Sequence, residues 1–388
     1  MANRGVHDPM TLTPGPSAAV SLAPVNPEPS AQDMDRAISE ATLAVDDLRW
    51  LKPGDTVFIK PVINSGAPYP STTSALAVAG MIRLLKKRGA GRVVVGDMSG
   101  VFHFDQKPDG CKGSTRELAK SAGLFHAVED AGAEWAFFEE SGWESFHEER
   151  PAPGSHWKQG LMLPNVIREV DHIVSMPRCG RHSLFGSTLG LKSVVGYMRF
   201  DTRLEYHHEA GSIQEKTAEA NTVPTLLEKQ RLVVTAADKV LATFGPHRGH
   251  VIAPKQGLVI ASRSVVAHDL ISLAWLIMQW NRAPWHAKQA LTDPSSNRIV
   301  ANLSNRVVCG VLGGWNQALS AESMEHSPQP EIWRDRILRR AFALMGGVPN
   351  IQLQPTQPSI SPQLLAEFAS MVTPKRGDRA ASPRAHAR

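Results

Sequence analysis

The segment "TVFIKPVINSGAPYPSTTSALAVAGMIRLLKKRGAGRVVVGD", residues 56–97, decides the fold. It opens with a short apolar run at 56–63, rich in β-branched residues and followed by Gly and Pro, which is typical of a buried strand. Residues 72–90 have the spacing of a helix, and residues 91–97 form a second apolar strand. The order strand, helix, strand predicts two parallel strands joined by a crossover helix.

The same alternation continues outside this segment. Strands are expected at 133–139, 171–177, 231–240 and 257–266, and helices at 33–51, 114–130, 268–281, 330–346 and 362–372. No internal repeat interrupts the pattern. The sequence therefore predicts an α/β fold with mainly parallel sheets and flanking helices.

The length of the chain indicates more than one lobe. Its 388 residues exceed the size at which a single core stops growing. Because the chain is polar and irregular over 141–164, we predict a first lobe at 33–150, a second at 151–372, and a site in the cleft between them. Residues 1–32, rich in Pro, Ser and Ala, and the basic residues 373–388 are expected to be disordered tails.

The positive charge is concentrated at the C-terminal end. The net charge is +5, and five Lys or Arg residues against one Asp in residues 373–388 supply +4 of it. The remaining chain is close to neutral. Since a nucleic-acid-binding protein carries a basic face on its folded body, we expect no nucleic-acid partner.

Cysteine usage and hydropathy argue against a disulfide-rich, iron–sulfur, secreted or membrane-spanning protein. Cys111, Cys179 and Cys309 are far apart and form no CxxC pair, so we expect no disulfide framework and no iron–sulfur cluster held by this chain. The N-terminal residues lack the apolar core of a secretory signal, and no apolar run reaches about 18 residues. We therefore expect a cytoplasmic protein without a membrane partner.

A cationic, glycine-rich stretch, "SMPRCGRHSLFGSTLGLKSVVGYM", covers residues 175–198 and contains no acid. It leaves the carboxyl end of a predicted strand, where open α/β sheets bind ligands. The spacing of its glycines and Lys192 does not match the phosphate loop of nucleoside triphosphatases. Glycines still let backbone N–H groups approach an anion, and Arg178, Arg181 and Lys192 supply charge. We expect an anion site with His182 as acid or base; the alternative is tight packing with solvated cations.

Two other predicted strands end in polar side chains. Lys60 and Asn64 follow the first strand, and Asp97 ends the second. A lysine at a buried strand end is costly without a partner. It either binds a ligand or forms an ion pair with Asp97.

Residues 199–211, "RFDTRLEYHHEAG", carry further candidates. Arg203 is a candidate for binding an anion. His207 and His208 are candidate metal ligands, although adjacent histidines cannot easily share one metal and often lie on the surface. Further along, Asp269 is expected near a helix N-terminus, where it would act as a cap.

Several motifs together resemble the family called domain of unknown function 362. They are "VFIKPVIN", "GRVVVGD", "DHIVSMPRCGRHSLFGSTLGLKSVVG", "RLVVTAAD", "FGP" and "GLVIASRSVVAHD", in this order between Val57 and Trp275. The most specific part is His182, Thr188 and Lys192 at their spacing. The family usually shows Lys-x-Lys-x-His where this chain has "RCGRH". Many relatives append a ferredoxin-type cluster domain, and we expect none in this chain.

The chain is also distantly similar to the lactate racemase family. His182 and Lys192 are ten residues apart, and Lys192 and His208 are sixteen apart, as in that family's active site. The resemblance implies that the first histidine is a proton-transfer base. It also implies that the lysine holds a nickel-pincer nucleotide and that the last histidine binds nickel. A metal or a metal-containing nucleotide is the cofactor that follows from it.

These observations favour a small-molecule enzyme that acts on an anionic carboxylate or phosphate by histidine-mediated proton transfer, as in an isomerase or racemase. The alternatives are a carrier for an anionic metabolite or metal cofactor, and a redox enzyme that uses an external cofactor. A homo-oligomer is also expected. The candidate residues are His182, Lys192 and Asp97 for catalysis; Lys60, Asn64, Arg178, Arg181, Thr188 and Arg203 for binding; and His207 and His208 for a metal.

Overall fold

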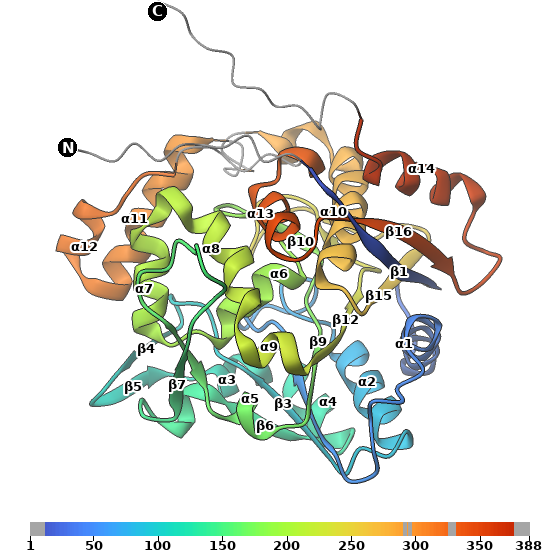
Figure 1. Cartoon of the computed structure of the whole chain (residues 1–388), viewed down its shortest axis with the longest axis horizontal. Helices are drawn as coiled ribbons and strands as arrows, with labels where there is room; N and C mark the ends of the chain where they lie inside the picture. Colours follow the sequence, from blue (N-terminus) through green and yellow to red (C-terminus); the bar gives the residue numbers. More distant parts are fainter. Residues whose placement is uncertain (1–11, 290–292, 294–296, 325–330, 376–388) are drawn as a thin grey trace, which may run out of the picture.

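An eight-stranded sheet forms the centre of the molecule (Figure 1). The computed structural model describes residues 12–289, 293, 297–324 and 331–375. In spatial order the strands are β16 (Val348–Pro355), β1 (Pro14–Val25), β15 (Gly257–Ser262), β12 (Gln230–Ala236), β9 (His172–Ser175), β2 (Thr56–Lys60), β3 (Arg92–Asp97) and β6 (Glu134–Phe137).

The sheet is mainly parallel. Only the two pairs that involve β15 are antiparallel, and the other five are parallel. β2 and β3 lie side by side with Val57 opposite Val93, and α2 (Ala75–Lys87) connects them. The strand–helix–strand unit predicted from residues 56–97 is confirmed.

Both faces of the sheet are covered by helices. Val57 and Ile59 point into one core, together with apolar residues of α1 (Ala31–Val45), α2 and α4 (Leu124–Asp130). Phe58, between them in the strand, points into the other core. This alternation follows from the period of two in a strand, and it explains why the central strands are apolar throughout.

The second core is the larger of the two. It contains residues of α10 (Val265–Arg282), which contacts β15, β1 and β12 directly. Around it lie α5 (Val166–Glu169), α6 (Gly190–Ser193), α7 (Phe200–His208), α8 (Ile213–Glu219), α9 (Pro224–Lys229), α13 (Arg336–Leu344) and α14 (Pro362–Val372). Helix α3 (Thr115–Ser121) belongs to a third, small cluster, in which Ala119 packs with Phe125 and Phe137.

Smaller elements surround the main sheet. A four-stranded sheet has the order β11 (Gly186–Thr188), β10 (Gly180–His182), β13 (Val240–Leu241) and β14 (Val251–Ile252). Two hairpins pair β4 (Phe104–Lys107) with β5 (Gly110–Gly113) and β7 (Phe146–Glu149) with β8 (Leu161–Pro164). Helices α11 (Arg298–Gly313) and α12 (Trp315–Ser320) pack on α7 at the edge of the molecule (Figure 1).

The α/β class, the mainly parallel sheet and the flanking helices are confirmed. The predicted lobes, 33–150 and 151–372, do not have separate sheets, because β9 pairs with β2 and joins their strands into one sheet. The site described below is therefore a pocket at one edge of this sheet. Among the residues that the structure describes, no helix is long and apolar enough to cross a membrane.

The expectation of a disordered tail over residues 1–32 is wrong for residues 14–25. Residues 14–25 form β1, which lies between β15 and β16. Val20 and Leu22 are fully buried. The composition is poor in large apolar residues, but pairing on both sides satisfies the backbone and needs only small side chains. The first eleven residues and residues 376–388 of the predicted tails lie outside the described part.

Candidate active site

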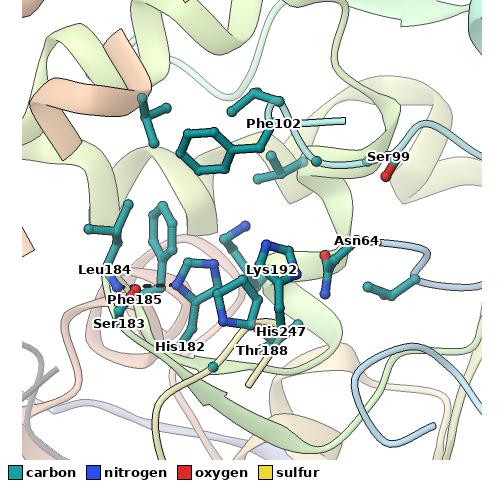
Figure 2. Close-up of a pocket in the computed structure, with 18 of the residues that line it drawn as sticks. Asn64, Ser99, Phe102, His182, Ser183, Leu184, Phe185, Thr188, Lys192 and His247 are labelled. Carbon is teal, nitrogen blue, oxygen red and sulfur yellow. Dashed lines mark hydrogen bonds between the residues drawn. The ribbon is translucent and has the colours of Figure 1, made fainter. Parts of the chain in front are cut away.

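A pocket of about 630 Å³ lies at the carboxyl ends of β2 and β3. This is the edge at which parallel sheets bind ligands. Figure 2 shows residues from distant parts of the sequence around it. Of the residues predicted from the sequence, eight line the pocket: Lys60, Asn64, Asp97, His182, Thr188, Lys192, Arg203 and His207.

Lys60 and Asp97 form a buried ion pair across neighbouring strands. The Nζ atom of Lys60 lies 2.7 Å from Oδ1 of Asp97, and the backbone N–H of Ile63 donates to Oδ2 at 2.6 Å. Burial lowers the pKa of Lys60, and Asp97 opposes that change. A Cβ atom on Gly196 would lie 2.2 Å from Oδ1 of Asp97, so the pair needs a glycine there. The ion-pair alternative is thus the one observed.

Lys192 faces the pocket from α6. Its side chain is partly exposed, and Nζ lies 4.3 Å from the ring centre of Phe185. Burial, followed by repulsion from Arg203, Arg178 and Lys60, lowers its pKa to about 7. The lysine is therefore close to half-protonated at neutral pH.

Arg203 reaches the pocket from α7 and is held by main-chain oxygens. It donates to the carbonyl groups of Met198 at 2.8 Å and Met98 at 3.0 Å, and to that of Ser99. Burial lowers its pKa to about 10. These contacts fix the guanidinium but bring no negative charge to it.

Arg178 lies behind the pocket rather than in its lining. It is fully buried and donates to the carbonyl of Pro70 and to Oγ1 of Thr188, at 3.3 and 3.1 Å. In the described residues, Arg178, Lys192 and Arg203 have no carboxylate within ion-pair distance. Asp97 of the pocket lining already pairs with Lys60 and attracts Lys192 and Arg203 only from a longer distance, so positive charge exceeds negative charge around the pocket, which favours the binding of an anion.

His182 presents a hydrogen-bond donor. Its Nδ1 accepts the backbone N–H of Leu184 at 3.1 Å, so the proton of the neutral ring is on Nε2. Burial, followed by repulsion from Lys192 and Arg178, lowers its pKa well below the usual value. The ring packs edge-on against Phe185 with centroids 4.8 Å apart, and it lies in the group of side chains shown in Figure 2.

His207 presents the opposite tautomer. The Nδ2 group of Asn305 donates to the carbonyl of His207 at 2.8 Å, which fixes the amide so that its Oδ1 lies 2.8 Å from Nδ1 of the ring. Nδ1 therefore carries the proton, and Nε2 is an acceptor. Burial lowers the pKa of His207 to about 3. Two neutral histidines with opposite roles thus line one pocket.

His103, His247 and Ser99 also line the pocket, although they are not among the candidate site residues chosen from the sequence. The rings of His103 and His247 meet edge-on at 5.4 Å. Within the described chain, His103 Nε2, His247 Nδ1 and Ser99 Oγ are buried without a hydrogen-bond partner. Unsatisfied buried atoms of this kind are uncommon and indicate a missing ligand or water. The signal in the sequence was their position in loops after strands.

The rest of the pocket wall is apolar. It includes Val101, Phe102, Leu184, Val307 and Val308, and Phe102 stands on the side of the cavity opposite His182 in Figure 2. Phe102 is 54% exposed, so it forms part of the rim. The pocket thus combines a polar, cationic wall with an apolar wall, a usual property of sites for small organic molecules.

A predicted binding residue, Arg181, and a predicted metal ligand, His208, lie elsewhere. Arg181 is buried outside the pocket lining, where it donates to the carbonyl of Gly186 at 2.7 Å and lies 3.8 Å from Asp293. His208 is on the outer side of α7, with Nε2 2.9 Å from Oγ of Ser320. A helix turns by about 100° per residue, so His207 faces inward and His208 does not.

Within the glycine-rich stretch, the backbone N–H groups at the start of α6 are already hydrogen-bonded and cannot bind an anion. Those of Gly190 and Leu191 donate to the two carboxylate oxygens of Asp269, at 2.8 and 2.7 Å. Asp269 therefore caps α6 and not its own helix, which begins with Ser264 as cap. Charge for a ligand must come from side chains instead.

The comparisons with known proteins decide the family. A family model described as domain of unknown function (DUF362) matches residues 57–274, more than half of the chain. The chain belongs to the DUF362 family. This confirms the resemblance found in the motifs, and the family description names no activity.

Relatives of this DUF362 chain are distant. The thylakoid-associated protein sll1697 of Synechocystis sp. is 24% identical over 229 residues, which are 57% of this chain and 63% of that protein. The chain thus matches less than two thirds of that relative's length. Among solved structures, the lactate racemase apoprotein of Thermoanaerobacterium thermosaccharolyticum has a TM-score of 0.38 and 13% identity, covering 62% of this chain and 54% of that one. A Thermotoga maritima protein has a TM-score of 0.36 and 12% identity, covering 65% and 59%.

The donor set of this DUF362 chain does not fit a metal that the chain holds alone. No group of three or more His, Cys, Asp or Glu side chains suited to a metal occurs in the described residues. At the pocket, Nδ1 of His182 is occupied by a backbone N–H and Asp97 by Lys60 and Ile63. A metal role for His207 or His208 therefore gains no support from the geometry.

Proposed function

We propose that this protein is a small-molecule enzyme whose substrate is an organic carboxylate with an apolar part. The observation that carries the proposal is the excess of positive charge around a pocket that also contains two neutral histidines: the cations Lys60, Arg178, Lys192 and Arg203 gather there with the carboxylate of Asp97. A carboxylate would neutralise the cations, and the apolar wall would accommodate the rest of the molecule.

The two histidines suggest a division of roles. Lys192 and the Nε2–H of His182 would donate to the carboxylate, and Nε2 of His207 would accept a proton from the carbon beside it. The bound carboxylate would offset the repulsion from Lys192 and Arg203 and so raise the pKa of His207 above its value of about 3 in the empty pocket, as a base requires. The electron pair of the broken C–H bond would move into the carboxylate as an enolate, which the same donors stabilise. Return of the proton from His207 to carbon completes an exchange or an isomerisation. Histidine-mediated proton transfer thus remains our proposal, with His207 rather than His182 as the base.

Binding is the first test. Phenylacetate and mandelate, which combine a carboxylate with an apolar ring, should bind by isothermal titration calorimetry. Lys192→Ala should weaken this binding by about 1.5–3 kcal/mol, because it removes a charged hydrogen-bond donor. Lys255→Ala, at an exposed lysine outside the pocket, is the control and should bind as the wild type does.

Turnover is the second test. In D₂O the wild type should exchange the α-hydrogen of one of these acids, followed by the loss of its proton NMR signal. His207→Gln should retain binding and slow exchange by about 10²–10⁴-fold, the usual contribution of a general base. His126→Gln, on the exposed face of α4, should leave exchange unchanged.

The same data separate the alternatives. Binding that depends on Lys192, without exchange in any variant, would identify a carrier for an anionic metabolite. If neither acid nor inorganic phosphate binds the wild type more tightly than Lys192→Ala, the proposal of an anion site is wrong. A redox reaction with an external cofactor, a homo-oligomer, a cytoplasmic location and the lack of a nucleic-acid partner stay predictions.

A further inference from the structure

Two histidines from different loops meet in one part of the pocket. His103 follows β3, His247 follows β13, and their rings lie edge-on with centroids 5.4 Å apart. Both residues line the pocket, and so does Arg248, the residue after His247. We call His103, His247 and Arg248 the His103–His247 subsite. Figure 2 shows the ring of His247 beside that of His182, and the two rings repel each other's positive charge, so the subsite adjoins the proposed carboxylate site.

The backbone of the subsite is fixed, but polar atoms in it lack partners. The N–H of His103 donates to the carbonyl of Gly100 at 3.0 Å, and the carbonyl of His247 accepts the hydroxyl of Ser71 at 3.1 Å. Within the described residues, Nε2 of His103 and Nδ1 of His247 are buried without a hydrogen-bond partner. The same holds for Oγ of Ser99, a residue that is only 1% exposed. Because buried polar atoms are nearly always paired, these three atoms indicate a group that enters the pocket.

Both rings of the subsite are neutral in the empty protein. Burial lowers the pKa of His103. Burial, followed by repulsion from His103, Arg178 and Arg248, lowers the pKa of His247 to about 4. Each neutral ring has one N–H group to donate. The repulsion at His247 means that its surroundings favour negative charge.

The positive charge of the pocket exceeds what one carboxylate can offset. The cations in its lining or directly behind it are Lys60, Arg178, Lys192, Arg203 and Arg248. In the described part of the chain, the carboxylates that act on them are Asp97, which pairs with Lys60, and Glu139, which attracts Arg203 from outside the lining. The ion pair of Arg181 with Asp293, also outside the lining, adds no net charge. Even with Lys192 only half-protonated, a bound monocarboxylate would therefore leave an excess of positive charge.

We propose that the substrate carries a second anionic group, and that this group binds at the His103–His247 subsite. The inference rests on the proposed function, in which Lys192 and His182 bind the first carboxylate. The second group, a carboxylate or a phosphate ester, would accept hydrogen bonds from the two imidazoles and from Ser99. Its charge would pair with Arg248. The substrate class is then a dicarboxylate or a phosphorylated carboxylate, with its apolar part against the apolar wall.

Other occupants of the subsite fit less well. A hydroxyl group or a water molecule can form hydrogen bonds with the imidazoles and Ser99, but it leaves the charge of Arg248 and of the pocket as it is. A cationic group or a metal ion would be repelled. A separate phosphate ion beside a monocarboxylate has the right charge, and the experiment below distinguishes it from a second group on the substrate.

Calorimetry with matched acids tests the inference. Phenylsuccinate and 4-carboxyphenylacetate add a second carboxylate to phenylacetate, at a short and at a longer distance. At least one of them should bind the wild type about 10–100-fold more tightly than phenylacetate, the effect of one additional charged hydrogen bond. The half-amide of each diacid, which is neutral at the second position, should lose most of this gain.

Two variants locate the second group. Arg248→Met and His247→Phe should each reduce the ratio of the affinities for the better diacid and for phenylacetate to about threefold or less. A ratio measured within one variant cancels any general effect of the substitution on the pocket. Arg88→Met changes an exposed arginine at the end of α2, outside the pocket lining, and should keep the wild-type ratio. Circular dichroism checks that each variant is folded.

The outcomes distinguish this inference from the proposed function. If phenylacetate binds through Lys192 but neither diacid binds more than about threefold better, the carboxylate site stands and the second subsite is wrong. The inference also fails if the half-amides bind as tightly as the diacids, because the subsite then recognises a neutral group. It fails again if inorganic phosphate raises the affinity for phenylacetate in the wild type but not in Arg248→Met, since a separate anion then occupies the subsite. If none of the acids binds the wild type, both proposals are wrong.

Discussion

Lys192 should make ligand binding depend on pH. Burial and the cations Arg203, Arg178 and Lys60 lower its pKa to about 7, so in the empty protein the amine loses its charge above that pH. The affinity for phenylacetate should then fall as the pH rises through about 7, by up to about tenfold per pH unit. Calorimetry between about pH 6 and pH 9 measures this slope.

The matched variant is Lys192→Arg. An arginine keeps its charge over this whole range, so its binding curve should be flatter. A wild-type affinity that stays constant across pH 7, or a Lys192→Arg variant with the same slope, would show that another group controls binding.

Gly196 should be needed for its small size. A Cβ there would lie 2.2 Å from Oδ1 of Asp97 and 2.5 Å from Nζ of Lys60. Gly196→Ala should therefore separate the ion pair and lower the free energy of unfolding by about 1–3 kcal/mol, measured in urea. Gly310→Ala is the control, because a Cβ there meets its nearest neighbour at 3.4 Å. Equal stability of the two variants would contradict the tight contact.

Much of the pocket could be predicted from the sequence, because a single rule about the carboxyl ends of parallel strands places most of its polar residues. Side chains that follow parallel strands meet at one edge, which brought Lys60, Asp97 and His182 together. The choice between His207 and His208 needed the rotation of α7: His207 lines the pocket, and His208, which the spacing favoured, lies outside the lining. The place of Arg181 needed the partners that its guanidinium finds in the fold, which no local pattern gives.

At the scale of elements, α6 should depend on a carboxylate from another helix. Asp269 of α10 accepts hydrogen bonds from the backbone N–H groups of Gly190 and Leu191, which are the two residues that precede Lys192. Asp269→Asn replaces one acceptor by a donor and should cost about 1.5–3 kcal/mol of unfolding free energy. It should also weaken phenylacetate binding, since Lys192 is on the same short helix.

The control for this variant is Asp47→Asn, at a carboxylate that is 60% exposed and pairs with the exposed Arg49. Its unfolding free energy should change little. If Asp269→Asn is as stable as Asp47→Asn and binds as well as the wild type, the cap does not position Lys192.

Some elements could not be predicted from local patterns. β1 reads as a tail because proline, serine and alanine dominate it, yet those small residues fit between β15 and β16. The strands of the central unit are different, since Val, Ile and Phe fill both faces and the pattern is unambiguous. When a strand is buried only because distant strands pair with it, its own sequence shows little of the apolar pattern of a strand.

For the whole molecule, a single sheet joins the two regions that the sequence divides. β9 lies beside β2, and the pocket takes residues from both regions at this common edge. The relative positions of Lys60 and Lys192 therefore rest on hydrogen bonds between strands and not on a hinge. Ligand binding and global stability should consequently be lost together when the sheet is disturbed.

The N-terminal strand β1 allows a direct test of whether the whole chain folds around this single sheet. Leu22 of β1 is fully buried, with Ile260 of β15 on one side and Pro355 of β16 on the other. Leu22→Ala should reduce the free energy of unfolding by about 2–5 kcal/mol, as for other buried leucines, and deletion of residues 1–25 should prevent folding. Deletion of residues 1–11, which leaves β1 intact, is the control. Urea unfolding followed by circular dichroism measures all three. If the 1–25 deletion unfolds at the same urea concentration as the control, β1 is dispensable and these residues are the tail that their composition suggests.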